Sequence, residues 1–236
     1  MRFSIIIPAR NEEGFIARCL ESIQVAAKPF DQDAEIVVVL NRCTDRTEKI
    51  ARPYGAITIR DESKSLSMIR NTGVRSACGD IIVTIDADSW MSPNMLIEID
   101  RLLNSCKYIG GGVLMYPERL SLGIVFTILL ILPVLLRHGV SGGLFWCFRS
   151  DFEAIHGFDE SLVSAEDIDF ARRLKLYGKT RGKRFKTITK AHIMTSCRKF
   201  DTFGDWYFAR NPHLAWKILQ GKDAKAANSF FYDVPR

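Results

Sequence analysis

The chain has 236 residues, which is long enough for one α/β domain whose core needs neither disulfides nor structural metals. Its six cysteines are scattered without a Cys-x-x-Cys pair, a pattern typical of reduced thiols and not of a disulfide framework or a zinc site. The net charge of +6 is concentrated in residues 171–200, with eleven Lys or Arg and no acid; without a nucleic-acid motif, this stretch favours a solvated face, a diphosphate or an anionic membrane surface over nucleic acid.

The first part of the chain alternates strands with helices. Residues 1–10 contain a five-residue apolar core before Pro8, too short for a signal peptide, so we expect the protein to remain in the cytoplasm. Hydrophobic patterning predicts strands over 3–7, 35–40, 56–59 and 81–85, and helices over 11–25 and 65–77. This alternation indicates an α/β fold with a mostly parallel central sheet, flanking helices and a Rossmann-like, nucleotide-binding half. No linker or repeat divides the chain, so we expect a single domain over 1–236.

Two carboxylates directly follow the fourth predicted strand. Residues 81–85 are all β-branched and uncharged, which is typical of a strand covered on both faces. Asp86 and Asp88 then fall at its carboxyl end, where α/β sheets bind ligands. Neighbouring carboxylates repel each other, and Mg²⁺ or Mn²⁺ would relieve that repulsion. The alternative is that Asp88 caps a helix entered through Ser92-Pro93.

Polar residues also gather near the ends of the other predicted strands. They are Pro8-Ala9-Arg10-Asn11-Glu12-Glu13 after the first strand, Asn41-Arg42-Cys43-Thr44-Asp45-Arg46-Thr47 after the second, and Arg70-Asn71-Thr72-Gly73 before the fourth. Asn11 and Thr44 or Asp45 have a simpler alternative role as helix caps. Because parallel strands end at one sheet edge, three such clusters beside two aspartates favour a common site.

Residues 120–136 form a segment without any charge. Seventeen helical residues span about 26 Å, less than the roughly 30 Å of a bilayer core, and Pro133 would kink them. A membrane span is therefore the least favoured of three alternatives. The others are a helix buried in the protein or in a homodimer interface, and a helix lying in the membrane interface, which Arg119 and Arg137 at its ends favour.

Several short motifs of this chain, taken in order, resemble those of the family 2 glycosyltransferases with the GT-A fold. The matching segments are Ser4-Ile5-Ile6-Ile7-Pro8-Ala9-Arg10-Asn11-Glu12, Thr44-Asp45-x-Thr47, Arg70-Asn71-x-Gly73, Asp86-Ala87-Asp88, Gly142-Gly143, and Gly157-Phe158-Asp159-Glu160 leading to Glu166-Asp167. Each motif is unspecific alone, but the ordered set extends over about three quarters of the chain. The resemblance implies an enzyme, similar to the hexosyltransferases, that moves a sugar from a nucleoside-diphosphate sugar to an acceptor hydroxyl.

The resemblance assigns the sugar donor to residues 1–115. Its nucleotide-sugar contacts would be Pro8, Ala9, Asn11, Glu12, Asn41, Asp45, Arg70, Asn71, Asp86 and Ala87, with Arg198 as a bidentate hydrogen-bond donor to the diphosphate. Asp88 and Asp86 would hold Mn²⁺ or Mg²⁺, a Lewis acid that stabilises the departing diphosphate. His192, which follows a further predicted strand over 185–189, is a candidate third ligand because metal-dependent members often add a late histidine, although a lone histidine is more often structural.

The resemblance assigns the acceptor, a glycan or a lipid-linked saccharide, to residues 116–236. Acceptor contacts would be Gly142, Gly143 and Glu166. An attacking hydroxyl must lose its proton, and Asp167 is the candidate base, with Glu166 supporting it. Spacing alone does not separate these two acids from Asp169, and the alternative role of Asp167 is to stabilise a helix N-terminus. Direct displacement with one base would invert the anomeric centre.

The identity of the donor base and two other functions remain open from the sequence. Where the family usually has an acid pair after the second strand, this chain has Leu40-Asn41, and asparagine does not choose uracil over guanine, so UDP and GDP sugars are both expected candidates. A nucleotidyltransferase is one alternative, but it would need a glycine-rich phosphate loop after the first strand. The other is a catalytically silent, membrane-associated protein that binds nucleotide sugars. If residues 120–136 lie in the membrane interface, the enzyme would sit peripherally on the cytoplasmic face.

Overall fold

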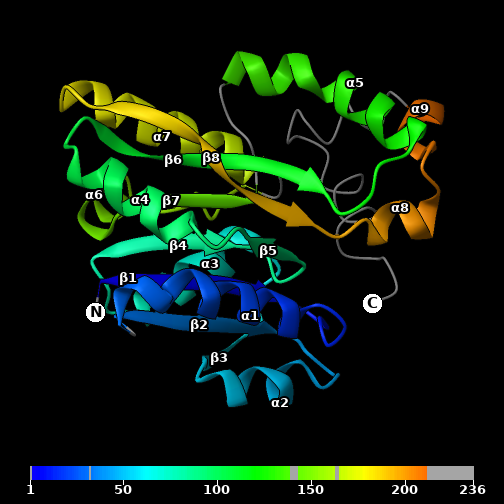
Figure 1. Ribbon diagram of the computed structural model, residues 1–236, viewed down its shortest axis with the longest axis horizontal. Coiled ribbons are helices and arrows are strands. Elements are labelled where there is room, and N and C mark those ends of the chain that lie inside the picture. Colours follow the sequence, from blue (N-terminus) through cyan, green and yellow to red (C-terminus); the bar gives the residue numbers. More distant parts are fainter. Residues whose placement is uncertain (1, 32, 139–142, 163–164, 212–236) are drawn as a thin grey trace.

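The computed structural model describes residues 2–31, 33–138, 143–162 and 165–211, and the statements below concern these residues. Eight strands form one mixed sheet in the order β3-β2-β1-β4-β7-β6-β8-β5 (Figure 1). The strands are β1 Phe3–Ala9, β2 Ala34–Asn41, β3 Ile57–Asp61, β4 Ile81–Ile85, β5 Ser89–Met91, β6 Tyr108–Pro117, β7 Leu144–Phe148 and β8 Arg184–Thr195. The helices are α1 Ile16–Ala27, η1 Lys28–Phe30, α2 Thr47–Ala51, η2 Arg52–Tyr54, α3 Leu66–Arg75, α4 Met95–Asn104, α5 Leu122–His138, α6 Arg149–Ala154, α7 Glu166–Thr180, α8 Arg198–Phe203 and α9 Tyr207–Arg210.

The predicted α/β fold is confirmed, and four of the seven neighbouring strand pairs are parallel. Two apolar layers cover the parallel part of the sheet, because successive side chains of a strand point to opposite faces. Ile5 and Ile7 of β1 pack in the layer that contains α1 and α4, whereas Ile6 packs in the layer that contains α3, α6 and α7. All six cysteines are free thiols, as their spacing predicted. Strands β1 to β4 are parallel to one another, so their carboxyl ends lie at one edge of the sheet.

The first helix begins later than the hydrophobic pattern predicted. α1 begins at Ile16 and not at Asn11, because Asn11 has a left-handed backbone with a φ of 52° and Glu12 begins a turn. The carbonyl oxygen of Glu12 accepts the N–H of Phe15 at 3.0 Å. The polar residues after β1 consequently form a loop at the sheet edge.

Close backbone packing holds the second half of the sheet. β7 runs antiparallel to β4, and β6 runs parallel to β8. A Cβ added at Gly111 of β6 would lie 1.7 Å from the carbonyl oxygen of Lys186 on β8, so only glycine fits there. β8 is longer than the predicted strand 185–189 and continues to Thr195.

The last strand of the sheet returns to the vicinity of β4. β5 pairs antiparallel with β8, and Ser89 lies opposite Thr195. Residues 86–88 alone separate β5 from β4, and such a link spans at most about 14 Å. The sheet therefore curls, and the chain that leaves β8 passes beside the two aspartates.

α5 lies along the upper edge of the molecule in Figure 1, outside the two packed layers. Ile124 and Thr127 face inward and are 1% and 6% exposed, whereas Leu122 and Leu129 are 80% and 60% exposed. The described side chains of α5 therefore contradict the alternative that this helix is buried within the protein. Within the described ranges, no helix is long and apolar enough to cross a membrane.

Candidate active site

A buried arginine joins acids from two distant motifs. Arg70 of α3 is 1% exposed and donates hydrogen bonds to Asp86 Oδ1 at 2.9 Å and to Asp167 Oδ1 at 2.6 Å. Its Nη1 also lies 3.4 Å from Glu166 Oε1, and its guanidinium carbon is 5.1 Å from the centre of the Phe158 ring. Glu166 and Asp167 open α7, where the helix dipole favours negative charge. Arg70 therefore holds the acid that follows β4 beside the acids that begin α7.

The shared cation and the burial of these acids change their protonation. Burial, followed by the closeness of Asp167, raises the pKa of Glu166 to about 7, against the attraction of Arg70. Desolvation by the surrounding protein also raises the pKa of Asp86, again opposed by Arg70, although 37% of its side chain is exposed. Burial disfavours the charge of Arg70 itself, but Asp167, Asp86 and Glu166 outweigh it and raise the guanidinium pKa. Glu166 therefore keeps its proton to a higher pH than an exposed glutamate does.

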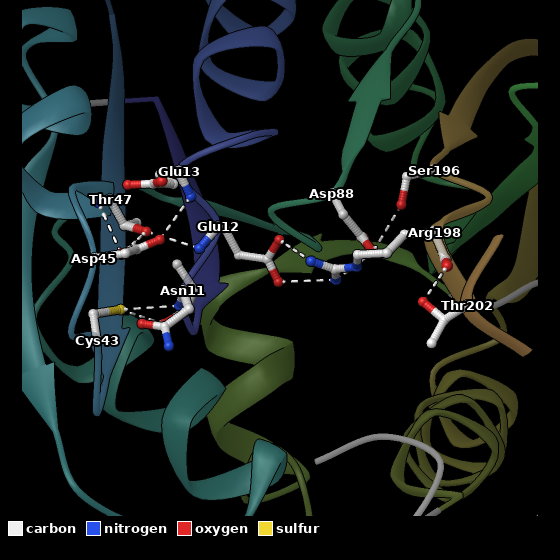
Figure 2. A network of polar contacts seen from close by, with 11 residues as sticks. Asn11, Glu12, Glu13, Cys43, Asp45, Thr47, Asp88, Ser196, Arg198 and Thr202 are labelled. Carbon is white, nitrogen blue, oxygen red and sulfur yellow. Dashed lines mark hydrogen bonds and ion pairs between the residues drawn. The ribbon is translucent and has the colours of Figure 1, made fainter. Parts of the chain in front are cut away.

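A second arginine lies across the site from Arg70. Figure 2 shows the Arg198 guanidinium between Glu12 and Asp88. Its two terminal nitrogens donate to the two Glu12 oxygens at 2.8 and 3.1 Å, and Nη2 also donates to Asp88 Oδ2 at 3.2 Å. The Ser196 hydroxyl donates to the same Asp88 oxygen at 3.2 Å. These contacts connect the loop after β1, the turn after β4 and the chain after β8.

Side-chain hydrogen bonds tie the loop after β1 to the loop after β2 (Figure 2). Asp45 accepts the N–H of Glu13 at 2.9 Å and the hydroxyl of Thr47 at 2.6 Å. Burial acts to raise the pKa of Asp45, but these hydrogen bonds outweigh burial and lower the pKa. Asn11 accepts the N–H of Thr44 at 2.8 Å. Asn11 and Asp45 are both predicted to contact the nucleotide sugar. In this structure their side chains position the two loops of the site.

Two further asparagines brace the chain around the site. Asn41 is 1% exposed, and its amide donates to the carbonyl oxygens of Asp61 and Ser63, both at 2.8 Å. Asn71 donates to the carbonyl oxygen of Phe158 at 2.8 Å and accepts its N–H at 3.0 Å. Both amide hydrogens of Asn41 are thus used within the protein, and Asn71 places Phe158 next to Arg70.

The remaining predicted contacts lie along the same strand ends. Ala9 and Ala87 are 2% and 3% exposed, and Pro8 is half-buried near the end of β1. Gly143 precedes β7 with a φ of 88°, a conformation that favours glycine. Gly142 lies outside the described residues.

Asp86 and Asp88 offer oxygen ligands, although each is paired here with a different arginine. Their side chains are 37% and 19% exposed, so a cation can reach them. The His192 side chain is exposed on β8, and its ring lies 5.5 Å from that of Tyr116. The part of the chain that the structure describes contains no ready group of three metal-binding side chains. Carboxylate oxygens are nevertheless the donor type that Mg²⁺ and Mn²⁺ prefer, so the chemistry of the two aspartates fits such an ion.

Sequence reasoning missed how these residues pair. The partners Glu12 and Arg198 are 186 residues apart, and no local pattern connects them. The Phe158 ring beside Arg70 was also missed, although its position in the Gly157-Phe158-Asp159-Glu160 motif was a usable signal.

Relatives of known classification match this chain. Residues 4–113 match the family model for glycosyl transferase family 2. Glycosyltransferase AglE of Haloferax volcanii is 27% identical over 221 residues, which cover 86% of this chain and 68% of AglE. The matches to two other curated relatives cover much less of those proteins, 27% of the length of one and 13% of the length of the other.

Solved structures share the fold. TarS 1–349 of S. aureus, in complex with UDP-GlcNAc, has a TM-score of 0.66 at 17% identity, and the match covers 99% of this chain and 71% of TarS 1–349. Mannosyltransferase PcManGT of Pyrobaculum calidifontis, in complex with GDP-Man and Mn²⁺, has a TM-score of 0.65 at 20% identity, covering 100% of this chain and 65% of PcManGT. These likenesses concern the fold alone. They show that the chain has the GT-A-like α/β fold of these glycosyltransferases, and residues 4–113 are similar to glycosyl transferase family 2.

Proposed function

We propose that the protein transfers a sugar from a nucleoside-diphosphate sugar to an acceptor hydroxyl. The observation that carries this proposal is the buried Arg70, which holds Asp86 at the end of β4 beside Asp167 and Glu166 at the start of α7. The donor half, residues 1–115, and the acceptor half, residues 116–236, then meet across this cation in a single domain. The similarity of residues 4–113 to glycosyl transferase family 2 supports the proposal, as do structural neighbours with bound GDP-Man and UDP-GlcNAc.

Asp167 is the proposed general base. The hydrogen bond from Arg70 at 2.6 Å orients its carboxylate, and its side chain is 24% exposed, so an acceptor hydroxyl can reach it. A positioned base of this kind contributes roughly 10²–10⁴ in rate. With the diphosphate leaving from the opposite side of the sugar, a single displacement inverts the anomeric centre. Glu166 lies beside Asp167 and is proposed to support it and to contact the acceptor, together with Gly142 and Gly143.

The donor diphosphate is proposed to lie between Arg198 and the turn formed by residues 86–88. Arg198 has the planar donor geometry that matches two phosphate oxygens, and it can turn its Nη2 from Asp88 to a phosphate. Asp88 and Asp86 would hold Mn²⁺ or Mg²⁺, which when bound stabilises the leaving diphosphate as a Lewis acid. His192 is proposed as the third ligand. Measuring the Mn²⁺ affinity of the His192→Ala variant tests this assignment. An affinity equal to that of the wild type would rule it out.

The donor is of the UDP or GDP type, because neighbours of the same fold bind one or the other. The acceptor is a glycan or a lipid-linked saccharide. A glycan acceptor is supported by Agl6 of Haloferax volcanii, a hexosyltransferase of low-salt glycan biosynthesis. Agl6 is 35% identical to this chain over 101 residues, which cover 43% of this chain and 24% of Agl6. The exposed apolar side chains of α5 support a lipid-linked saccharide as the acceptor, with the enzyme working at the cytoplasmic face of a membrane.

A thermal-shift panel of UDP, GDP, CDP and dTDP sugars, with and without Mn²⁺, tests donor binding. A ligand at about 100 times its dissociation constant adds roughly 2.7 kcal/mol to the unfolding free energy, which is easily measured. Asp167→Asn should keep this stabilisation and lose transfer. If no nucleotide stabilises the protein, or if the product retains the donor's anomeric configuration, the proposed reaction is wrong. Release of pyrophosphate from a nucleoside triphosphate would indicate a nucleotidyltransferase.

A further inference from the structure

The outward side of α5 is apolar. Its buried positions include the small or polar Gly123 and Thr127, whereas Leu122, Val125, Phe126, Leu129, Leu130 and Leu132 are exposed. These six positions share one face of the helix, because they recur at helical spacing. A surface helix in water usually has the reverse arrangement, with its polar side outward. A contiguous exposed apolar surface of this kind marks a site of contact with a protein or a membrane.

The outward side of α7 is basic. Arg172, Lys175, Leu176 and Lys179 are exposed and follow the spacing of one helix face. The opposite face of α7, with Phe170 and other apolar residues, packs against the sheet. The exposed stripe carries three cations, of which Arg172 also donates to the largely buried Asp169 at 3.2 Å, and Leu176 within it is 52% exposed. This composition suits a surface that is anionic and has an apolar layer behind its charges.

The two helices lie on the same side of the molecule. In Figure 1, α5 and α7 both lie in the upper part of the molecule, with α7 overlapping β8 and α5 to its right. Trp206 adds to this side, because it is 45% exposed and its ring lies 6.3 Å from that of Phe126. Tryptophan is enriched where a protein crosses from the polar to the apolar region of a bilayer.

Charge favours a bilayer over a second copy of this chain. A twofold dimer built on this side would bring the basic stripe of one α7 toward an equivalent basic surface, and neither exposed face contributes an acid to compensate. Anionic headgroups supply that compensation over the whole surface. We propose that α5 and α7 together dock the protein on an anionic lipid bilayer, with the apolar side chains of α5 in the interface and the cations of α7 on headgroup phosphates.

Vesicle flotation with the full chain tests this proposal without any sugar donor, so its outcome is independent of the proposed transfer reaction. Wild-type protein should bind vesicles that contain phosphatidylglycerol at least tenfold more tightly than vesicles of phosphatidylcholine alone, and this preference should weaken with added salt. Leu122→Asp/Leu129→Asp should reduce binding at least tenfold on both kinds of vesicle. Lys175→Glu/Lys179→Glu should reduce binding at least tenfold on the anionic vesicles alone.

Matched variants on other exposed surfaces control for hydropathy and for net charge. Val25→Asp/Ile57→Asp changes two exposed apolar residues, and Lys28→Glu/Lys49→Glu makes the same charge change on α2 and η1. Both should bind like wild type, and circular dichroism melts should show that every variant is folded. The proposal is overturned if wild type does not bind, or if the control variants lose as much binding as the α5 and α7 variants. A dimer in light scattering that Leu122→Asp/Leu129→Asp dissociates, without vesicle binding, would assign the surface to a second copy.

Discussion

At Arg70, one buried guanidinium offsets three carboxylates. Its side chain is 2% exposed, and Asp86, Asp167 and Glu166 all lie within 3.4 Å of its terminal nitrogens. Removing one partner from a buried ionic cluster leaves uncompensated charge, which is far more costly than losing a surface ion pair. The charge balance of the site therefore depends on this residue.

Substitution of Arg70 should destabilise the whole protein. Arg70→Met is expected to lower the unfolding free energy by about 3–5 kcal/mol, because the three acids then repel each other in a buried setting. Urea unfolding at pH 7.5 measures the change. Arg75→Met is the control on the same helix, since Arg75 pairs with Glu160 but is 63% exposed, and it should cost less than about 1 kcal/mol. Equal losses for both variants would contradict the role assigned to Arg70.

Glu166 should make stability depend on pH near neutrality. Its folded pKa, about 7, lies above the ordinary value of 4.5, so between these values the folded state binds more protons than the unfolded state. Stability contributed by this group is thus present at low pH and falls as the pH rises toward 7, by at most about 1.4 kcal/mol per pH unit. Glu166→Gln should remove this decline.

Urea unfolding of wild type and Glu166→Gln at pH 5, 6, 7 and 8 measures the effect. The unfolding free energy of wild type should fall relative to that of the variant as the pH rises. Glu153→Gln, at an exposed position of α6, should follow wild type. Parallel curves for wild type and Glu166→Gln would mean that Glu166 titrates normally in the folded protein.

Among the elements, the β6–β8 pair is the most sensitive to added volume. A Cβ at Gly111 would overlap the backbone of β8, which no side-chain adjustment can relieve. Gly111→Ala should therefore cost about 3 kcal/mol, the upper end of typical overpacking penalties. Gly14→Ala is the matched control, because a Cβ there meets no atom within 4 Å. Thermal and urea unfolding compare the two, and a small cost at Gly111 would show that β6 and β8 can separate.

Elements with a regular local pattern were predictable, and their ends were less so. The strand over 81–85 was predicted with its correct bounds because five β-branched residues are bounded by charge on both sides. The predicted start of α1 at residue 11 was wrong, because contacts with Thr44 and Asp45 hold the helix-compatible residues 11–15 in a loop. The extension of β8 to Thr195 depends on pairing with β5, which is distant in sequence and leaves no periodic signal.

At the scale of the whole molecule, Arg198 connects three segments that are remote in sequence. A nucleotide that stabilises the protein should therefore slow amide hydrogen exchange together in residues 10–13, 86–88 and 196–198. In Arg198→Gln the last segment should lose this protection, while β3, at the other edge of the sheet, should be unaffected in both proteins. Mass spectrometry of peptic fragments measures the exchange. Protection confined to one segment would contradict a donor site shared by all three.

The sequence predicted which residues gather at the site better than it predicted their partners. Parallel strands place their carboxyl ends at one edge, so the meeting of the loops after β1 and β2, seen in the hydrogen bond from Thr44 to Asn11, followed from topology. Hydrogen-bond partners depend on tertiary geometry, and therefore the use of Asn41 to brace the chain after β3 was not predictable. The same holds for the curl of the sheet that brings Arg198 to Asp88.

The pairing of Arg198 with Glu12 and Asp88 also has a consequence for biosynthesis. A ribosome makes the chain from the N-terminus, so Glu12 emerges 186 residues and Asp88 110 residues before the arginine that bridges them. Until Arg198 has emerged, the nascent chain carries both acids without this cation. The bridge across the site can therefore close only after Arg198 has emerged, and a nascent chain that stops before it should not hold the proposed nucleotide sugar.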